Sequence, residues 1–302
     1  MGATEIVQAL VSPTEKLIDA ISGAIGKAYE PKHIRKMADA KAYELKLIAE
    51  TVRSNSDVPI VYNSTGVAID TSNFEEIAKR ASSRLAYQEI AKQQNIEAVT
   101  DYAYDELESF DAVSNEPVNP DWMFRFFNSV ENISDVEMQK LWGHILAGEI
   151  RTPNTYSYRT LEKLKNMTQQ EAQIFQNIAA MALKSSGIYF LLENSEILKR
   201  YEIYFMHLLK MQECGLIETR PVSLTLTGSV EKPDFISNSN IIALFYGKTN
   251  DPQKENISVY VFTESGVQLI KGLSIRSNEQ YIIDCVNSIR KSKVNFVLLH
   301  TI

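Results

Sequence analysis

Apolar side chains return every three or four residues between Ser12 and Ala28, which predicts an amphipathic helix near the start of the chain. Ser12 stands three residues before Glu15, and Pro13 occupies the first helical position. Both features are typical of a capped helix start. Gly23 lowers helix stability by roughly 1 kcal/mol relative to alanine, so we expect another helix to approach closely there, or the helix to bend.

Two further apolar series predict a body of long helices. In residues 34–52 the apolar positions step by threes and fours and are mostly alanine, which resembles a coiled-coil seam. The next series begins at Ser72, reaches about Phe110, and is followed after Pro120 by a helix that carries Trp122. Residues 58–70 interrupt this body with two β-prone runs around a turn-forming tetrad. They predict either a small hairpin insertion or an extended exposed loop.

A compact helical block follows these long helices. Ser134 precedes Glu137 by three residues and Thr168 precedes Glu171 by three, so we expect a capping box at the start of each helix. Between them, residues 135–148 place their apolar side chains on one helical face. The predicted core residues of this face are Leu141, Trp142, Ile145 and Leu146.

Three short motifs in this block carry a family resemblance: Leu141-Trp142, Leu146-Ala147 and the run from Leu164 to Thr168. They resemble the bacterial Abi-alpha family, which is linked to abortive infection, and a related domain-of-unknown-function family. Residues near the N-terminus resemble the same proteins: Pro13, Leu17, Ile18, Gly23, Gly26, Tyr29, Pro31, Ile34 and Arg35. The resemblance covers about two thirds of the chain and supplies no catalytic residues. It implies an interaction protein that affects bacterial survival during phage infection.

After Thr168 the pattern becomes typical of a winged-helix module. One helix through Ala179 and a second from Ser195 to Glu213 are expected, followed by an extended run and, at residues 260–270, a strand that leads into a helix. The apolar run 294–299 predicts a final strand in the same sheet. The expected fold is therefore α+β and mainly α, with a helical domain at 1–166 and a winged-helix-like α+β domain at 167–302.

Charge is distributed unevenly along the chain, whose net charge is −7. Residues 101–150 contain eleven acidic residues against only Arg125 and Lys140. Because binding to phosphate needs a clustered basic face, nucleic acid is an unfavourable partner for this region. The acidic run is instead interpreted as a solvated helix face or as a docking surface for a basic partner. In the helix 195–213, acidic residues offset the basic ones, which favours protein contact over DNA reading.

A small basic patch lies beside the first helix and consists of Lys27, Lys32, Arg35 and Lys36. We interpret it as a solvated helix junction, with contact to anionic lipid headgroups or nucleic-acid phosphate as the alternative. No apolar run approaches the roughly 20 residues that span a bilayer, and the N-terminus lacks the pattern of a secretory signal. Cys214 and Cys285 are too few for a disulfide framework, which favours the cytoplasm.

Motifs of catalysis are absent from the sequence, which contains no HExxH, GxSxG, P-loop or CxxC. His144 and Glu137 are the catalytic candidates, because a spacing of seven residues places an imidazole and a carboxylate on one helix face. A surface or capping histidine is the favoured interpretation, and we expect no metal and no cofactor.

The favoured function is a non-enzymatic anti-phage protein that forms homo-oligomers and binds a phage or host protein. The alternatives are a hydrolase or nuclease with its site in the acidic middle region, and a winged-helix DNA-binding regulator.

Overall fold

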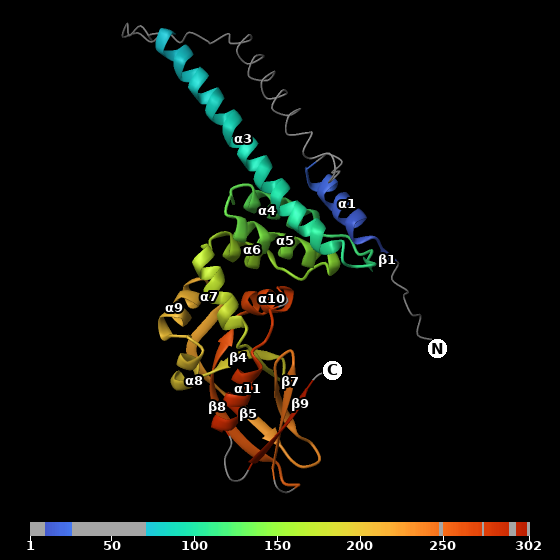
Figure 1. The fold of residues 1–302 in the computed structure, drawn as a ribbon, viewed down its shortest axis with the longest axis vertical. Helices are drawn as coiled ribbons and strands as arrows, with labels where there is room; N and C mark the ends of the chain where they lie inside the picture. The colour runs from blue at the N-terminus through green and yellow to red at the C-terminus, as the bar shows by residue number, and fades with distance from the viewer. Residues whose placement is uncertain (1–9, 26–70, 248–249, 274, 290–293, 301–302) are drawn as a thin grey trace, which may run out of the picture. The chain divides into compact units, whose positions relative to one another are not determined.

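The computed structural model describes residues 10–25, 71–247, 250–273, 275–289 and 294–300 (Figure 1). The chain divides into two compact units, Met1–Arg151 and Thr152–Ile302. The first unit is mainly helical and the second combines helices with an antiparallel sheet, so the predicted α+β class is confirmed. The hairpin at 58–70, the seam at 34–52 and the basic patch (Lys27, Lys32, Arg35, Lys36) lie outside the described residues.

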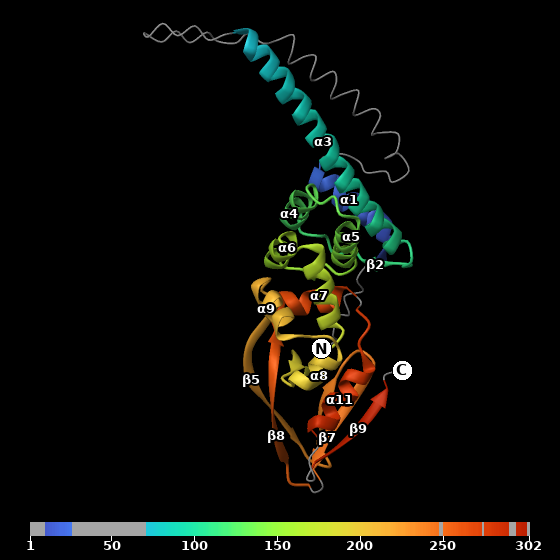
Figure 2. The same cartoon turned by 60° about the vertical axis from the view of Figure 1, so that its left-hand side comes forward.

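Four helices and a small strand pair form the described part of the first unit. The helices are α1 (Pro13–Ile25), α3 (Thr71–Leu107), α4 (Pro120–Val130) and α5 (Val136–Arg151), and the paired strands are β1 (Leu10–Val11) and β2 (Val113–Ser114). The C-terminal half of α3 packs against α5, α4 and α1, and its N-terminal half extends beyond α4 and α5 in both views (Figures 1 and 2).

The starts of these helices follow from local side-chain chemistry. The Asn119 side chain accepts hydrogen bonds from the backbone of Asp121 and Trp122, and Pro120 fills the first helical position of α4. At α5 the backbone N–H of Met138 donates to Asp135 Oδ1 at 2.9 Å. Asp135, one residue after the predicted Ser134, therefore caps this helix.

Aromatic rings and close backbone contact hold the first unit together. Trp142 on α5 is fully buried and meets the edge of Phe126 from α4, with 5.4 Å between ring centroids. The other three predicted core residues, Leu141, Ile145 and Leu146, are buried as well. Beside Trp142, a Cβ built on Gly143 would lie 2.5 Å from Cβ of Tyr102 on α3. The close helix approach is thus at Gly143, whereas no described atom comes within 4 Å of a Cβ built on Gly23.

The second unit is built on a seven-stranded antiparallel sheet with the order β5-β8-β4-β3-β6-β7-β9. Its strands are β3 (Leu183–Ser185), β4 (Ile188–Leu192), β5 (Ile217–Gly228), β6 (Asp234–Ser237), β7 (Ile241–Gly247), β8 (Gln253–Phe262) and β9 (Val294–His300). The last strand joins this sheet, as its apolar sequence predicts. Strand β5 pairs with β8 although β6 and β7 lie between them in sequence.

Six helices accompany this sheet in the described residues: α6 (Tyr158–Lys165), α7 (Gln169–Ala179), α8 (Ser195–Arg200), α9 (Phe205–Glu213), α10 (Glu264–Gly272) and α11 (Glu279–Ile289). Helix α6 packs against α10, and α11 packs on β7 and α8. The predicted capping box of Thr168 and Glu171 is confirmed at the start of α7. Because the units divide after Arg151 rather than after residue 166, α6 belongs to the second unit.

Candidate functional site

Two helices of the second unit, α8 and α9, are joined by a tight turn and carry exposed apolar side chains. The sequence predicted one helix over 195–213, and this was wrong, because the chain turns between α8 and α9. Glu202 adopts φ of +59°, a left-handed conformation that a helix cannot contain. The backbone N–H of Ile203 then returns to the carbonyl of Leu198 at 3.0 Å. The turn thus ends α8 and directs α9 along a new axis.

Asp284 on α11 anchors this turn to the rest of the unit. Its carboxylate accepts hydrogen bonds from Tyr201 Oη at 3.1 Å, Arg200 Nη1 at 3.4 Å and Gln280 Nε2 at 3.0 Å. The hydrogen bond from Gln280, followed by those from Tyr201 and Arg200, lowers the pKa of Asp284. Burial, followed by the hydrogen bond to Asp284, raises the pKa of Tyr201 to about 12. The start of α9 is therefore presented on a fixed support.

Three consecutive large side chains at the start of α9 point into solvent. Tyr204, Phe205 and Met206, called the apolar trio below, are 49%, 57% and 63% exposed. The opposite face of α9 packs in the core of the unit, where Leu208 and Met211 are buried. Exposed apolar side chains that adjoin one another on a rigid element are typical of protein-contact surfaces.

The basic side chains near the trio do not form a phosphate-binding face. Arg200 is held by Asp284. Lys199 and Lys210 lie on the two helices together with Glu196 and Glu213, and Glu202 lies in the turn between them. Base reading by a recognition helix needs polar or basic side chains at its N-terminal turn, and in α9 that turn carries Phe205 and Met206 beside a single polar residue, His207, whose ring packs on Tyr204.

Sequence reasoning missed the apolar trio, although the sequence carried a signal for it. Residues 204–209 read Tyr-Phe-Met-His-Leu-Leu, which is more apolar surface than the single buried stripe of a helix accommodates. Treating 195–213 as one continuous helix hid this excess. A break before Phe205 changes which side chains face the core.

The other end of α9 is tied to α6 by a lysine. Lys163 Nζ donates to the carbonyl oxygen of Gly215 at 2.5 Å, and Thr263 Oγ1 donates to the same oxygen at 2.7 Å. Gly215 has φ of +70°, and a Cβ there would lie 2.8 Å from Lys163 Cε. The positive φ favours glycine at this helix end, and a side chain there would displace the lysine amine from the carbonyl it caps.

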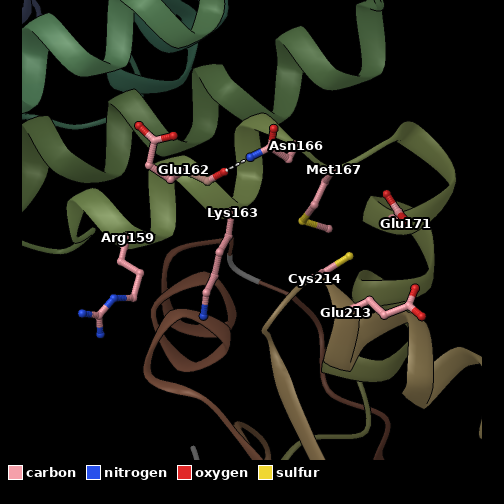
Figure 3. A pocket seen from close by; sticks show the side chains of 8 residues that line it. All are labelled: Arg159, Glu162, Lys163, Asn166, Met167, Glu171, Glu213 and Cys214. Atoms are coloured by element: carbon pink, nitrogen blue, oxygen red, sulfur yellow. Dashed lines mark hydrogen bonds between the residues drawn. The ribbon is translucent and has the colours of Figure 1, made fainter.

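A cavity of about 410 Å³ lies beside this cap (Figure 3). Its lining mixes both charges with two sulfur atoms: Arg159, Glu162, Lys163, Asn166, Met167, Glu171, Glu213 and Cys214. Burial, with Glu171 and Glu213 as lesser causes, raises the pKa of Cys214 to about 11, so the thiol stays protonated at neutral pH. Burial also lowers the pKa of Lys163, whose amine is occupied by Gly215. The thiol is thus protonated and the amine is engaged in the helix cap.

The predicted catalytic pair does not form, because its two members have other partners. Glu137 accepts a hydrogen bond from Lys140 Nζ at 2.7 Å. His144 Nδ1 instead contacts the carboxylate of Glu106, which comes from the last turn of α3. This hydrogen bond is the main cause that raises the pKa of His144, against a lowering by burial. His144 thus links α3 to α5 within the first unit.

Two buried charged residues of the first unit were also missed by the sequence reasoning. Lys16 on α1 is 8% exposed and Glu149 on α5 is 1% exposed. Burial lowers the pKa of Lys16, whereas Glu116 and Glu149 raise it. Because an uncompensated buried charge is costly, these nearby carboxylates favour the charged form of Lys16. No local pattern distinguishes Lys16 from the solvated charges of the same helix.

Across the residues described, no group of three or more His, Cys, Asp or Glu side chains is arranged to hold a metal ion. None of the described helices is both long and apolar enough to cross a membrane.

Residues 79–285 match the model of a family described as a protein of unknown function (DUF2806). No curated protein and no solved structure matches the chain.

Proposed function

The chain belongs to the DUF2806 family of proteins of unknown function, and we propose that it acts as a non-enzymatic interaction protein in bacterial abortive infection. In this proposal it self-associates and uses the apolar trio to bind a phage or host protein. The exposed trio on its fixed support is the observation that carries the proposal. The motifs that resemble Abi-alpha proteins supply the biological setting, and the two free cysteines, Cys214 and Cys285, fit a cytoplasmic location.

We further propose that the second unit contains a winged-helix core adapted to protein contact. Elements α7, β4, α8, α9, β5 and β8 follow one another in winged-helix order, and β4, β8 and β5 are neighbours in the sheet. In the sequence the β6–β7 hairpin falls between β5 and β8, where a winged helix has its wing, whereas in the sheet it lies between β3 and β9. In such a module α9 corresponds to the recognition helix, and its exposed apolar side chains favour a protein partner over a DNA groove.

A phage-challenge assay tests this function directly. Bacteria that express the wild-type chain are expected to reduce phage plating relative to vector controls, and the double variant Phe205→Ser/Met206→Ser is expected to lose that protection. Phe124→Ser is the matched control, because Phe124 is a similarly exposed aromatic residue on α4. Circular dichroism of each variant checks the fold. Protection that survives in the double variant would refute the role of the trio, and a wild type without protection against a broad phage panel would refute the setting.

A hydrolase is the second candidate, and the contact between His144 and Glu106 is the observation that favours it. A carboxylate that orients an imidazole is a common arrangement in acid–base catalysis. Loss of protection in a folded His144→Ala protein would favour this alternative.

A DNA regulator makes a different prediction, namely binding to duplex DNA that weakens steeply with salt.

A further inference from the structure

Strand β9 forms one edge of the seven-stranded sheet and is uncovered on both faces over part of its length. It pairs with β7 in an unbroken register from Val294 to His300, and no described strand pairs with its other side. Three consecutive side chains, Val297, Leu298 and Leu299, are 40%, 37% and 46% exposed. Because successive side chains of a strand alternate between faces, apolar surface is exposed on both sides of this edge.

The opposite edge of the sheet is protected against further pairing, and β9 is not. Strand β5 carries Pro221, which has no N–H to donate, and its register shifts between Glu218 and Val222. Proline, charge and bulges are the usual means by which proteins block an edge strand. Residues 294–299 read Val-Asn-Phe-Val-Leu-Leu and contain none of these features. Among the described strands, one edge of the sheet is thus blocked and the other is open.

We propose that β9 pairs antiparallel with β9 of a second copy of this chain, about a two-fold axis, and joins the two sheets into one. An antiparallel strand pair is self-complementary, because every outward N–H faces a carbonyl of the symmetry-related strand. The absence of charge in residues 294–299 means that self-pairing brings no like charges together. Apolar residues then meet apolar residues across the pair.

The exposed surface also sets the strength of this dimer. Three half-exposed aliphatic side chains per copy provide much less than the roughly 1,200 Å² buried in a stable interface. The dimer is therefore weak, with a dissociation constant in about the micromolar to millimolar range. The apolar stripe of α1 cannot supply an alternative interface, because Leu17 and Ile21 are already buried within the first unit. The β9 pairing rests on the self-association in the proposed function, for which it provides the interface.

Sedimentation velocity over a broad concentration range tests the pairing. The wild type is expected to shift from monomer to dimer, and Val297→Lys is expected to raise the dissociation constant at least about tenfold, because charge at an open edge opposes pairing. Val222→Lys is the matched control, since Val222 is 46% exposed on the protected edge β5. It is expected to dimerise as the wild type does. A wild type that stays monomeric, or equal effects of the two lysines, would overturn the proposal.

Cysteine cross-linking provides a second measurement that does not depend on the folding of the lysine variant. Cysteines are placed singly at Val297, Leu298, Leu299 and, as the control, Val222, and each protein is mildly oxidised. A disulfide-linked dimer is expected from at least one β9 position and not from Val222 or the wild type. No cross-link at any β9 position would contradict the pairing. If β9 fails both tests while the trio variants still lose phage protection, only the interface is refuted and the proposed function stands.

Discussion

Replacing Gly143 with alanine tests the packing of the first unit, because two effects of opposite sign act on the same residue. In a helix, alanine is more stable than glycine by about 1 kcal/mol. At Gly143, however, the new Cβ would lie 2.5 Å from Tyr102 Cβ and 3.2 Å from Val99 O and Ala103 N. These atoms belong to the backbone of α3 or are bonded to it, so no flexible side chain can move aside. The helices themselves must separate.

Overpacking of this kind costs typically 1–3 kcal/mol and more where backbone must move. Since Tyr102 Cβ lies well inside normal contact distance, we expect the upper part of that range, and Gly143→Ala should destabilise the first unit by about 2 kcal/mol net of the helix gain. Gly23→Ala is the matched control, because no described atom lies within 4 Å of its Cβ. There the helix gain acts alone, and we expect stabilisation of up to about 1 kcal/mol.

Tryptophan fluorescence during urea unfolding measures this difference in the first unit alone. Both tryptophans of the chain, Trp122 and Trp142, lie in that unit. The midpoint of Gly143→Ala should fall and that of Gly23→Ala should rise, with unchanged slopes. If both variants are stabilised alike, α3 and α5 do not pack as closely as described.

Three further outcomes follow from the same structure. Trp142→Ala should cost about 3 to 5 kcal/mol, measured by circular dichroism during urea unfolding, and a variant that keeps its stability but loses phage protection would place Trp142 in a binding site. Glu106 raises the pKa of His144 in the folded protein. The pair therefore contributes its full stabilisation below the unfolded pKa of about 6.5. This contribution is lost as the pH rises through the higher folded pKa. Glu106→Gln should therefore flatten the dependence of the urea midpoint between about pH 6 and 8, and an unaltered dependence would exclude the link. Burial raises the pKa of Cys214 to about 11 and that of Cys285 to about 12. Iodoacetamide should therefore label both thiols slowly in the folded chain at neutral pH and quickly only in urea. Rapid labelling of the folded chain would contradict the raised pKa values.

Local sequence patterns predicted the elements well where a cap or a turn decides them. The box of Thr168 and Glu171 starts α7, and Pro120 starts α4. The Ser134 cap was wrong by one residue because Asp135 is an equally good acceptor and the sequence does not say which side chain turns back. Such errors shift a boundary without altering the fold.

Long-range partners could not be predicted, because they depend on how the chain returns to itself. The imidazole of His144 meets Glu106 from another helix rather than Glu137 from its own. The break at Glu202, which exposes the apolar trio, is stabilised by Asp284 far along the chain. The sheet is likewise larger than the winged-helix pattern suggested, because the β6–β7 hairpin pairs with β3. Each of these features joins residues whose local sequence is unremarkable.

The insertion of β6 and β7 between two paired strands has a consequence for the order of folding. The β3–β4 and β6–β7 hairpins join residues that are close in sequence, and such pairs close quickly. The pairs that complete the sheet, such as Ile217 with Phe262 and Ile241 with His300, close long loops. Loop-closure entropy makes those steps slow. The second unit must therefore form its last edge, β9, late in folding, and until then β7 has an open side available to other chains.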